Sequence, residues 1–246
     1  MLADRKNLAL LLLQAPVIGF LLVLVSRPDA LVAGRFEAKK LIFMLATTGV
    51  WFGVINAARE ICKESHVLRR ERLAGLHTVP YLLSKVLVLS GLVLVLVQTA
   101  LLLGVVALGM RLPGSGVLLP AGLELYVTIA LAGIALGLAV SAIAATPDKA
   151  TSLIPIVLVP QVLFAGILFH LAGGTHAIST LVSSRAAVDA LSATIDTNSL
   201  ASPVPLPDEP EYAHVQTILL HAWGLLAAQA TLFTLAAWAG LRRGRT

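Results

Sequence analysis

Six long apolar stretches constrain the fold of this chain more than any other feature of its sequence. A helix needs about 20 mostly apolar residues to cross a bilayer. Stretches of about this length, separated by polar segments, are residues 7–26, 41–58, 86–110, 125–146, 150–172 and 215–241. Hydrophobic residues make up 58% of the chain and charged residues 13%, a balance typical of multi-pass membrane proteins. We therefore expect an all-α membrane protein in which residues 1–246 form a single transmembrane domain.

Basic residues predict how this domain is oriented. Lys and Arg in short loops stay on the cytoplasmic side of a membrane, and they gather at residues 5–6, 59–85 and 242–245. The loop over residues 173–214 has five acidic residues and only one basic residue, Arg185, as expected for the outer face. Six spans also place the two termini on the same side, which we expect to be cytoplasmic.

One loop disagrees with this orientation. Four basic residues lie between the first two spans, where the prediction places the outside: Arg27, Arg35, Lys39 and Lys40. Lys39 and Lys40 can extend their side chains to a membrane interface, and Asp29 and Glu37 offset part of the charge. We keep the orientation on the strength of the other loops. The net charge of +5 reflects topology and contact with anionic lipids, so we expect no nucleic acid partner.

The segment INAAREICKESHVLRRERLAGLHTVPYLLSK, residues 55–85, concentrates charge in the main cytoplasmic loop. Opposite charges recur at spacings of three and four residues, which stabilise a helix, and no Gly or Pro occurs over residues 56–74. We expect a helix over about 59–74, with Glu64 and Glu71 on one face because they are two turns apart. Its charges either dock a cytoplasmic partner or form a solvated loop that fixes the topology.

Catalytic motifs are missing from the sequence. It contains no phosphate-binding G-x-x-x-x-G-K-[ST] loop, no H-E-x-x-H and no G-x-S-x-G, so we do not expect this chain to be an enzyme or to bind nucleotide itself. His170 and His176 lie near the outer end of the fifth span, without a cysteine or carboxylate nearby in the sequence. We therefore expect no metal site.

Two motifs resemble a known family. The pattern N-A-x-R-E-I-x-x-E-x-x-V-x-x-R-E-R-x-x-G-L-x-x-x-x-Y-x-x-S-K, residues 56–85, resembles the membrane domain of G-subfamily ABC transporters, within the ABC-2-type permeases. The stretch LIPIVLVPQVLFAGILF, residues 153–169, is similar to the fifth helix of that family. The resemblance implies six transmembrane helices, a cytoplasmic coupling helix after helix two, and a re-entrant outer segment followed by a long outer loop after helix five.

This resemblance implies a function. The chain is expected to be the transmembrane half of a homodimeric ABC exporter in the plasma (inner) membrane of a bacterium, moving a hydrophobic or amphipathic, lipid-like substrate. ATP and Mg would bind to a partner ABC ATPase. That ATPase is either a separate subunit or a part fused upstream, because the start DRKNLALLLLQAP resembles bacterial proteins that carry forkhead-associated and ATPase domains before the permease.

Two rival functions are open. The first is a non-transporting membrane scaffold that binds a cytoplasmic partner through residues 59–74. The second is a channel or an ion-coupled carrier, which is less favoured because the predicted spans contain no acidic residue.

The resemblance also implies site residues. Those expected to couple the permease to the ATPase are Glu60, Glu64, Arg69, Arg70, Glu71 and Arg72. Those expected to line the substrate cavity, on helices two and five, are Phe52, Pro155, Val159 and Val162, and the outer gate would be formed by Ile167 and Leu168.

Other residues within the spans leave alternatives open. Gln98, Gln161, His221 and Gln229 either form hydrogen bonds between helices or contact substrate. Gly133 and Gly137 permit close helix packing, with dimerisation as the alternative use.

Overall fold

The structure is a computed structural model, and helices are its only regular elements in the part of the chain that it describes. The described residues are 5–58, 78–90, 105–107, 109–133, 136, 140–141, 144, 146–169, 173–203 and 207–243. The prediction of an all-α protein is thereby confirmed.

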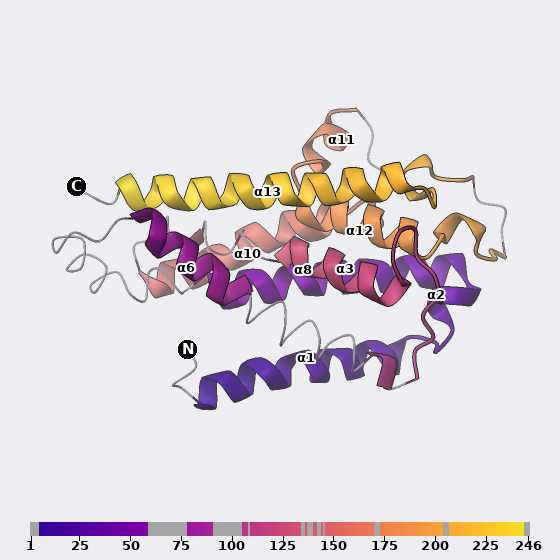
Figure 1. Cartoon of the computed structure of the whole chain (residues 1–246). Helices are drawn as coiled ribbons and strands as arrows, with labels where there is room; N and C mark the ends of the chain where they lie inside the picture. Colours follow the sequence, from indigo (N-terminus) through magenta and orange to yellow (C-terminus); the bar gives the residue numbers. More distant parts are fainter. Residues whose placement is uncertain are drawn as a thin grey trace.

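The helices form an elongated bundle (Figure 1). The elements are α1 (Arg5–Val25), α2 (Ala30–Ala33), α3 (Arg35–Ala57), α6 (Thr78–Ser90), α8 (Ala121–Gly133), α10 (Pro147–Leu163), α11 (Gly174–Ser179), α12 (Ser183–Thr194), η2 (Thr197–Ser199), η3 (Pro210–Tyr212) and α13 (Gln216–Arg243). The first residues of α1 and the last residues of α13 lie toward one end of the bundle. The short elements α2, η2 and η3 gather at the opposite end, which we call the loop end.

Two of the described helices, over Arg35–Ala57 and Gln216–Leu241, are long and apolar enough to cross a membrane. Shorter apolar helices cover Leu13–Val25 and Ala121–Gly133. Parts of the predicted spans 86–110 and 125–146 lie outside the described residues, so the arrangement of six spans stays a prediction.

Several helix boundaries differ from the expected spans, and two of them bear on the charged groups described below. Helix α3 begins at Arg35 rather than at residue 41, because Arg35 and Lys39 find partners at the loop end. Helix α10 ends at Leu163 rather than at residue 172. The chain turns at Gly166, whose φ of +84° is a backbone conformation that favours glycine.

Helices α3 and α8 pack closely through glycines. A Cβ atom placed on Gly53 would lie 1.6 Å from the carbonyl oxygen of Gly133, and one on Gly49 would lie 2.3 Å from Cγ2 of Ile129. Gly133 therefore packs within the chain, in agreement with the packing interpretation, whereas Gly137 lies outside the described residues.

Helix α12 is buried between α3, α8 and α13. Its sequence, SSRAAVDALSAT, is rich in Ser and Ala, which let neighbouring helices approach closely. Two hydrogen bonds fix α13 over this layer. Trp223 Nε1 donates to Thr128 Oγ1 at 2.9 Å, and Gln229 Nε2 donates to the carbonyl of Thr180 at 2.8 Å. Helix α12 and its neighbours position the charged groups at the loop end.

Candidate functional site

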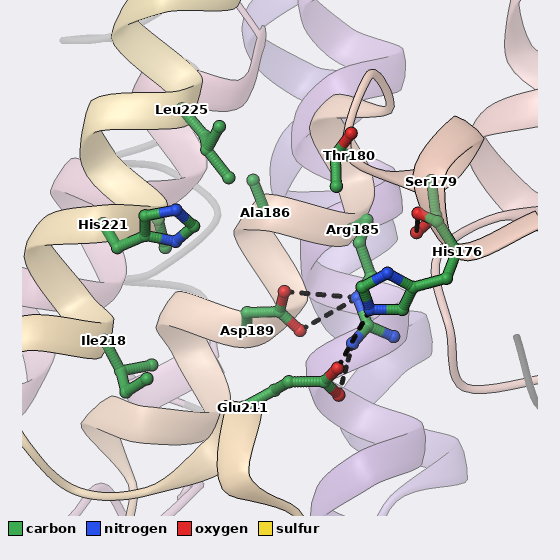
Figure 2. Close-up of a pocket in the computed structure, with 11 residues that line it drawn as sticks. His176, Ser179, Thr180, Arg185, Ala186, Asp189, Glu211, Ile218, His221 and Leu225 are labelled. Carbon is green, nitrogen blue, oxygen red and sulfur yellow. Dashed lines mark hydrogen bonds and ion pairs between the residues drawn. The ribbon is translucent and has the colours of Figure 1, made fainter. Parts of the chain in front are cut away.

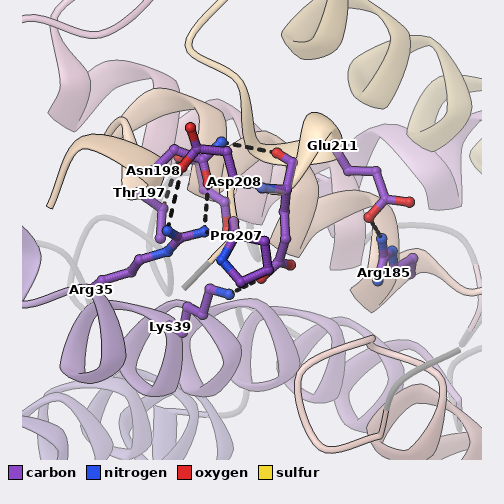
Figure 3. Close-up of polar contacts among 10 residues, drawn as sticks. Arg35, Lys39, Arg185, Thr197, Asn198, Pro207, Asp208 and Glu211 are labelled. Atoms are coloured by element: carbon purple, nitrogen blue, oxygen red, sulfur yellow. Dashed lines mark hydrogen bonds and ion pairs between the residues drawn. The ribbon is translucent and has the colours of Figure 1, made fainter. Parts of the chain in front are cut away.

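Arg35 is a buried cation at the start of α3. Its side chain is only 3% exposed. Nη2 donates to Asn198 Oδ1 at 2.9 Å and to the carbonyl of Pro207 at 2.7 Å, and Nη1 lies 3.5 Å from Asp208 Oδ1 (Figure 3). The backbone amide of Arg35 donates to the carbonyl of Ala201 at 2.9 Å. Arg35 therefore connects α3 to residues more than 160 positions later in the chain.

Lys39, one helical turn later, reinforces this connection. It forms an ion pair with Glu209 and lies 5.1 Å from the centroid of the Tyr212 ring. Glu209 is held in turn by Asn198, whose Nδ2 donates to the Glu209 carbonyl at 2.9 Å. We call Arg35, Lys39, Asn198, Asp208 and Glu209 the Arg35 clamp.

The Arg35 clamp explains the loop that disagrees with the predicted orientation. Arg35 and Lys39 meet the acidic residues of the 173–214 loop, so the two loops lie at the same end of the bundle. Lys40 instead pairs with Glu37 at 3.4 Å and lies 4.2 Å from the Phe36 ring centroid. Three of the four basic residues on the predicted outer side, Arg35, Lys39 and Lys40, thus have acidic partners from the same side.

A second charged group surrounds Arg185 on α12. Nε of Arg185 lies 3.1 Å from Asp189 Oδ1, and Nη2 lies 2.6 Å from Glu211 Oε2 (Figure 2). His176 Nε2 of α11 is 3.1 Å from the other oxygen of Glu211. These four residues, the Arg185 cluster, line a cavity of about 120 Å³ that His221, Ile218 and Leu225 of α13 also border.

Burial raises the pKa of Asp189 from 3.8 to about 7, and Glu211 adds to this effect, while the attraction of Arg185 only partly offsets it. Burial also acts to raise the pKa of Glu211, but Arg185 and His176 outweigh it, so the pKa of Glu211 is lowered. Within the cluster, Asp189 is therefore the carboxyl group that changes charge near neutral pH.

The raised pKa of Asp189 predicts that the folded protein loses stability as the pH rises. A group whose pKa is higher in the folded state stabilises the fold fully below pH 3.8, and that contribution is lost as the pH rises through about 7. Glu211 acts in the opposite sense, losing its contribution as the pH falls below its ordinary pKa of 4.5. The titratable or charged groups around Asp189 are Arg185 on α12, Glu211 and Tyr212 on η3, His176 on α11 and His221 on α13.

We expect Asp189→Asn to exceed the wild type in thermal stability by a wider margin at about pH 8 than at about pH 5, because asparagine mimics the protonated acid while the wild type loses stability as the pH rises from 3.8 to about 7. Thermal unfolding of the detergent-solubilised protein at both pH values measures this. Asp208→Asn is the control, because that acidic side chain is 79% exposed and lies outside the Arg185 cluster. Parallel pH dependence in the wild type and Asp189→Asn would contradict the assignment.

Glu124 forms a buried junction at the first turn of α8. It is 0% exposed and accepts backbone hydrogen bonds from Val117 at 3.1 Å, Leu118 at 2.5 Å and Leu119 at 2.8 Å. Thr194 Oγ1 of α12 donates to the same carboxylate at 2.8 Å. Glu124 thus joins the preceding loop, α8 and α12.

Replacing Glu124 with alanine is expected to destabilise the protein strongly, because three part-buried backbone amides and the buried Thr194 hydroxyl lose their acceptor. Each orphaned group costs about 1–3 kcal/mol. Glu124→Gln keeps one acceptor oxygen and is expected to lose less. Thermal unfolding measures the stability that each variant loses. We expect the largest loss in Glu124→Ala, a smaller loss in Glu124→Gln, and the smallest in Thr194→Val, which removes a single donor. Equal stability of Glu124→Ala and the wild type would show that the junction contributes nothing.

The structure answers the open question for two polar residues within the spans. Gln161 of α10 accepts a hydrogen bond from the Ser184 amide at 3.0 Å through Oε1, and its carbonyl accepts one from the Ser184 hydroxyl. Gln229 bonds to Thr180, as described above. Both glutamines therefore join helices within the chain, while His221 borders the cavity and Gln98 lies outside the described residues.

The predicted coupling residues lie outside the described part of the chain. They are Glu60, Glu64, Arg69, Arg70, Glu71 and Arg72, and the expected helix over 59–74 falls with them. Their role stays a prediction.

The predicted cavity residues are split between the interior and the surface. On α3, Phe52 is 2% exposed and packs in the core, whereas its neighbour Trp51 is 41% exposed. On α10, Pro155 and Val159 are exposed and Val162 is half-buried. The structure therefore brings Pro155 and Val159 to one exposed helix face but turns Phe52 into the chain's own core.

The predicted gate residues follow directly after α10. Ile167 is half-buried and packs against the core, and Leu168 is exposed. Among the described residues, no group of three or more His, Cys, Asp or Glu side chains is arranged to hold a metal ion. His176 instead pairs with Glu211, and His170 lies outside the described residues.

Sequence reasoning missed the partners at the loop end. Arg35 stands out in the sequence only as an exception to the predicted topology, and Glu124 does not stand out at all. One usable signal is the match between a basic loop and an acidic loop assigned to the same side of the membrane. The choice of Asn198 and Pro207 as partners of Arg35 depends on tertiary structure and has no signal in the sequence.

Two of the described helices are long and apolar enough to cross a membrane, and charged groups gather at the loop end. Residues 4–178 match the family described as ABC-2 type transporter, and the chain therefore belongs to that family. The family resemblance found in the sequence is confirmed. The chain is a permease component, which is not itself catalytic.

A curated relative adds a similarity to a larger transporter. Over 205 residues the chain is 29% identical to the ABC transporter ATP-binding/permease protein Rv1747 of Mycobacterium tuberculosis. The alignment covers 80% of this chain and 23% of that relative, so the chain spans less than a quarter of the relative's length.

Proposed function

We propose that the chain is the transmembrane half of a dimeric, ATP-driven exporter of a hydrophobic or amphipathic, lipid-like substrate. The observation that supports this most directly is the ABC-2 family match over residues 4–178, because ABC-2 permease domains work with ABC ATPases. Residues 1–246 would form one transmembrane domain with six spans, located in the inner membrane.

The proposed orientation places the loop end outside and both termini in the cytoplasm. Its support is that Arg35 and Lys39, which the positive-inside rule would draw inward, are paired with Asp208 and Glu209. Their charges are therefore offset locally.

The segment from α11 to α12 would be the re-entrant outer segment, since α12 is buried between α3, α8 and α13.

The substrate pathway is proposed to lie between two copies of the chain, along exposed apolar faces of α3 and α10. These two helices pack against each other. Val159 is 54% exposed on α10 and Trp51 is 41% exposed on α3. Because Phe52 is buried within the chain, we propose Trp51 in its place on the pathway surface, together with Pro155, Val159 and Val162. Ile167 and Leu168 would close the pathway toward the outside.

The ATPase is proposed to be either a separate subunit or an upstream part of a longer polypeptide. The second arrangement is supported by the relative, whose name joins ATP-binding and permease parts. In both cases ATP and Mg would bind to the ATPase.

Coupling through residues 59–74 predicts that Glu71→Lys leaves the protein folded and inserted but abolishes the stimulation of ATP hydrolysis by substrate. The reversed charge would repel a docking surface that is complementary to the wild type. The measurement is the ATPase rate of the reconstituted complex with and without substrate. Glu37→Lys makes the same substitution on a side chain that is 42% exposed near the loop end, and it should retain stimulation. Stimulation retained in Glu71→Lys would contradict coupling through this segment.

A non-transporting scaffold is the alternative, supported by the concentration of charge over residues 59–74. It predicts a bound cytoplasmic partner without nucleotide hydrolysis, so the ATPase measurement distinguishes the two functions.

A further inference from the structure

Arg185 directs its guanidinium nitrogens at different parts of the fold. Nε faces Asp189 on its own helix at 3.1 Å, and Nη2 faces Glu211 on η3 at 2.6 Å. Nη1 lies against the backbone at Gly166, in the turn that follows α10. One side chain, only 9% exposed, thus connects α12, η3 and the end of α10.

The guanidinium of Arg185 fits beside residue 166 because glycine has no side chain there. A Cβ atom at position 166 would lie 1.7 Å from Nη1 and 2.8 Å from Cζ of Arg185, so no larger residue fits there while Arg185 keeps its position. The φ of +84° at Gly166 also favours glycine. The turn before Ile167 and Leu168 and the position of Arg185 therefore depend on each other.

A neighbouring contact fixes the same two elements. The Ser184 amide donates to Gln161 Oε1 at 3.0 Å, and the Ser184 hydroxyl donates to the Gln161 carbonyl. That carbonyl belongs to the last turn of α10, where backbone acceptors lack partners within the helix. The first turn of α12 thus binds the end of α10 through Ser184, and the next residue, Arg185, contacts the turn at Gly166 that follows α10.

We propose that Arg185 is a positioning residue that keeps Ile167 and Leu168 in their closed arrangement by holding the Gly166 turn against α12 and η3. This inference rests on the proposed function, in which these two residues close the pathway. When the contact from Arg185 to Glu211 breaks, the turn is released from η3 and the end of α10 can move away from α12. Opening of the gate then requires the separation of an ion pair rather than of apolar side chains alone.

Hydrogen exchange over residues 164–169, measured by mass spectrometry on the complete transporter in lipid nanodiscs, tests the proposal. In Glu211→Gln, which keeps Arg185 but removes the charge of its partner on η3, exchange is expected to rise about tenfold, equivalent to about 1.4 kcal/mol of local opening free energy. Arg185→Gln is expected to raise it further. Arg185→Lys should recover part of the protection, because lysine keeps the charge but cannot contact three groups with one planar fork.

Asp208→Asn is the matched control, since it neutralises another acid of the same loop that pairs with Arg35 rather than Arg185. Exchange over residues 41–50 of α3 should stay at the wild-type level in every variant. Unchanged exchange over 164–169 in folded Glu211→Gln, or an equal rise in both segments, would overturn the proposal.

The wild-type ATPase assay tests the proposed function separately. If exchange rises as expected but substrate does not stimulate hydrolysis, the positioning role stands and the exporter assignment fails.

Discussion

Replacing Gly53 with alanine is expected to destabilise the protein strongly, because the added methyl group meets the backbone of a neighbouring helix. The new Cβ would lie 1.6 Å from the carbonyl oxygen of Gly133 and 2.5 Å from its Cα, so no flexible side chain can move aside to make room. Helices α3 and α8 would have to separate, and a further contact between them, between Gly49 and Ile129, would loosen with them. Overpacking typically costs about 1–3 kcal/mol, and we expect the upper end of this range or more.

Thermal unfolding in detergent, followed by the recovery of monodisperse protein in size-exclusion chromatography, measures the effect. Gly224→Ala on α13 is the matched control, because nothing lies within 4 Å of the Cβ that it adds. Alanine favours a helix over glycine by up to about 1 kcal/mol, so this control is expected to be neutral or slightly stabilising. Equal behaviour of the two variants would contradict the close crossing of α3 and α8.

Replacing Arg35 with alanine is expected to release residues 197–203 and 207–209 from α3. The change removes two part-buried hydrogen bonds, to Asn198 Oδ1 and to the carbonyl of Pro207. Hydrogen bonds made by charged groups contribute about 1.5–3 kcal/mol each, so we expect a loss of about 3 kcal/mol or more. The pair with Asp208 adds little, because that carboxylate is 79% exposed and separated by 3.5 Å.

Thermal unfolding and hydrogen exchange over Thr197–Ser199 measure the effect of Arg35→Ala. Arg27→Ala removes the same charge from an exposed position in the preceding loop and should leave both unchanged. Because each substitution removes a basic residue from the same predicted side, a topology effect would appear in both variants. Arg35→Lys keeps the charge without the planar fork and should lie between the wild type and alanine. Wild-type stability of Arg35→Ala would show that the Arg35 clamp does not hold the loop.

Apolar patterning predicted the helical class because the requirement for long uncharged segments in a bilayer leaves few alternatives. The family followed from two motifs, at residues 56–85 and 153–169, and the match to the ABC-2 family confirmed it. Helix ends were less predictable. Arg35 extends α3 beyond its apolar segment because partners distant in the sequence neutralise it, and hydropathy alone ends the span before such a residue.

The charged groups at the loop end could be predicted only in part. Acidic residues in 173–214 and basic residues between the first two spans are recognisable separately, but their pairing depends on how α12 and η3 fold back over α3. The sequence also could not predict whether the side chain of Phe52 faces the core or the surface. A shift of one residue turns a helical side chain by about 100°, which exchanges Phe52 in the core for Trp51 on the surface. Residue types alone do not fix that rotation.

The association with an ATPase is tested most directly by purifying the protein from its native membrane, identifying everything in the complex by mass spectrometry and assaying ATP hydrolysis. The exporter account predicts a Walker-motif ATPase, present as a separate subunit or on the same polypeptide, and hydrolysis that substrate stimulates. Purification of the chain as a stable complex without an ATPase and without nucleotide hydrolysis would contradict it and favour the scaffold.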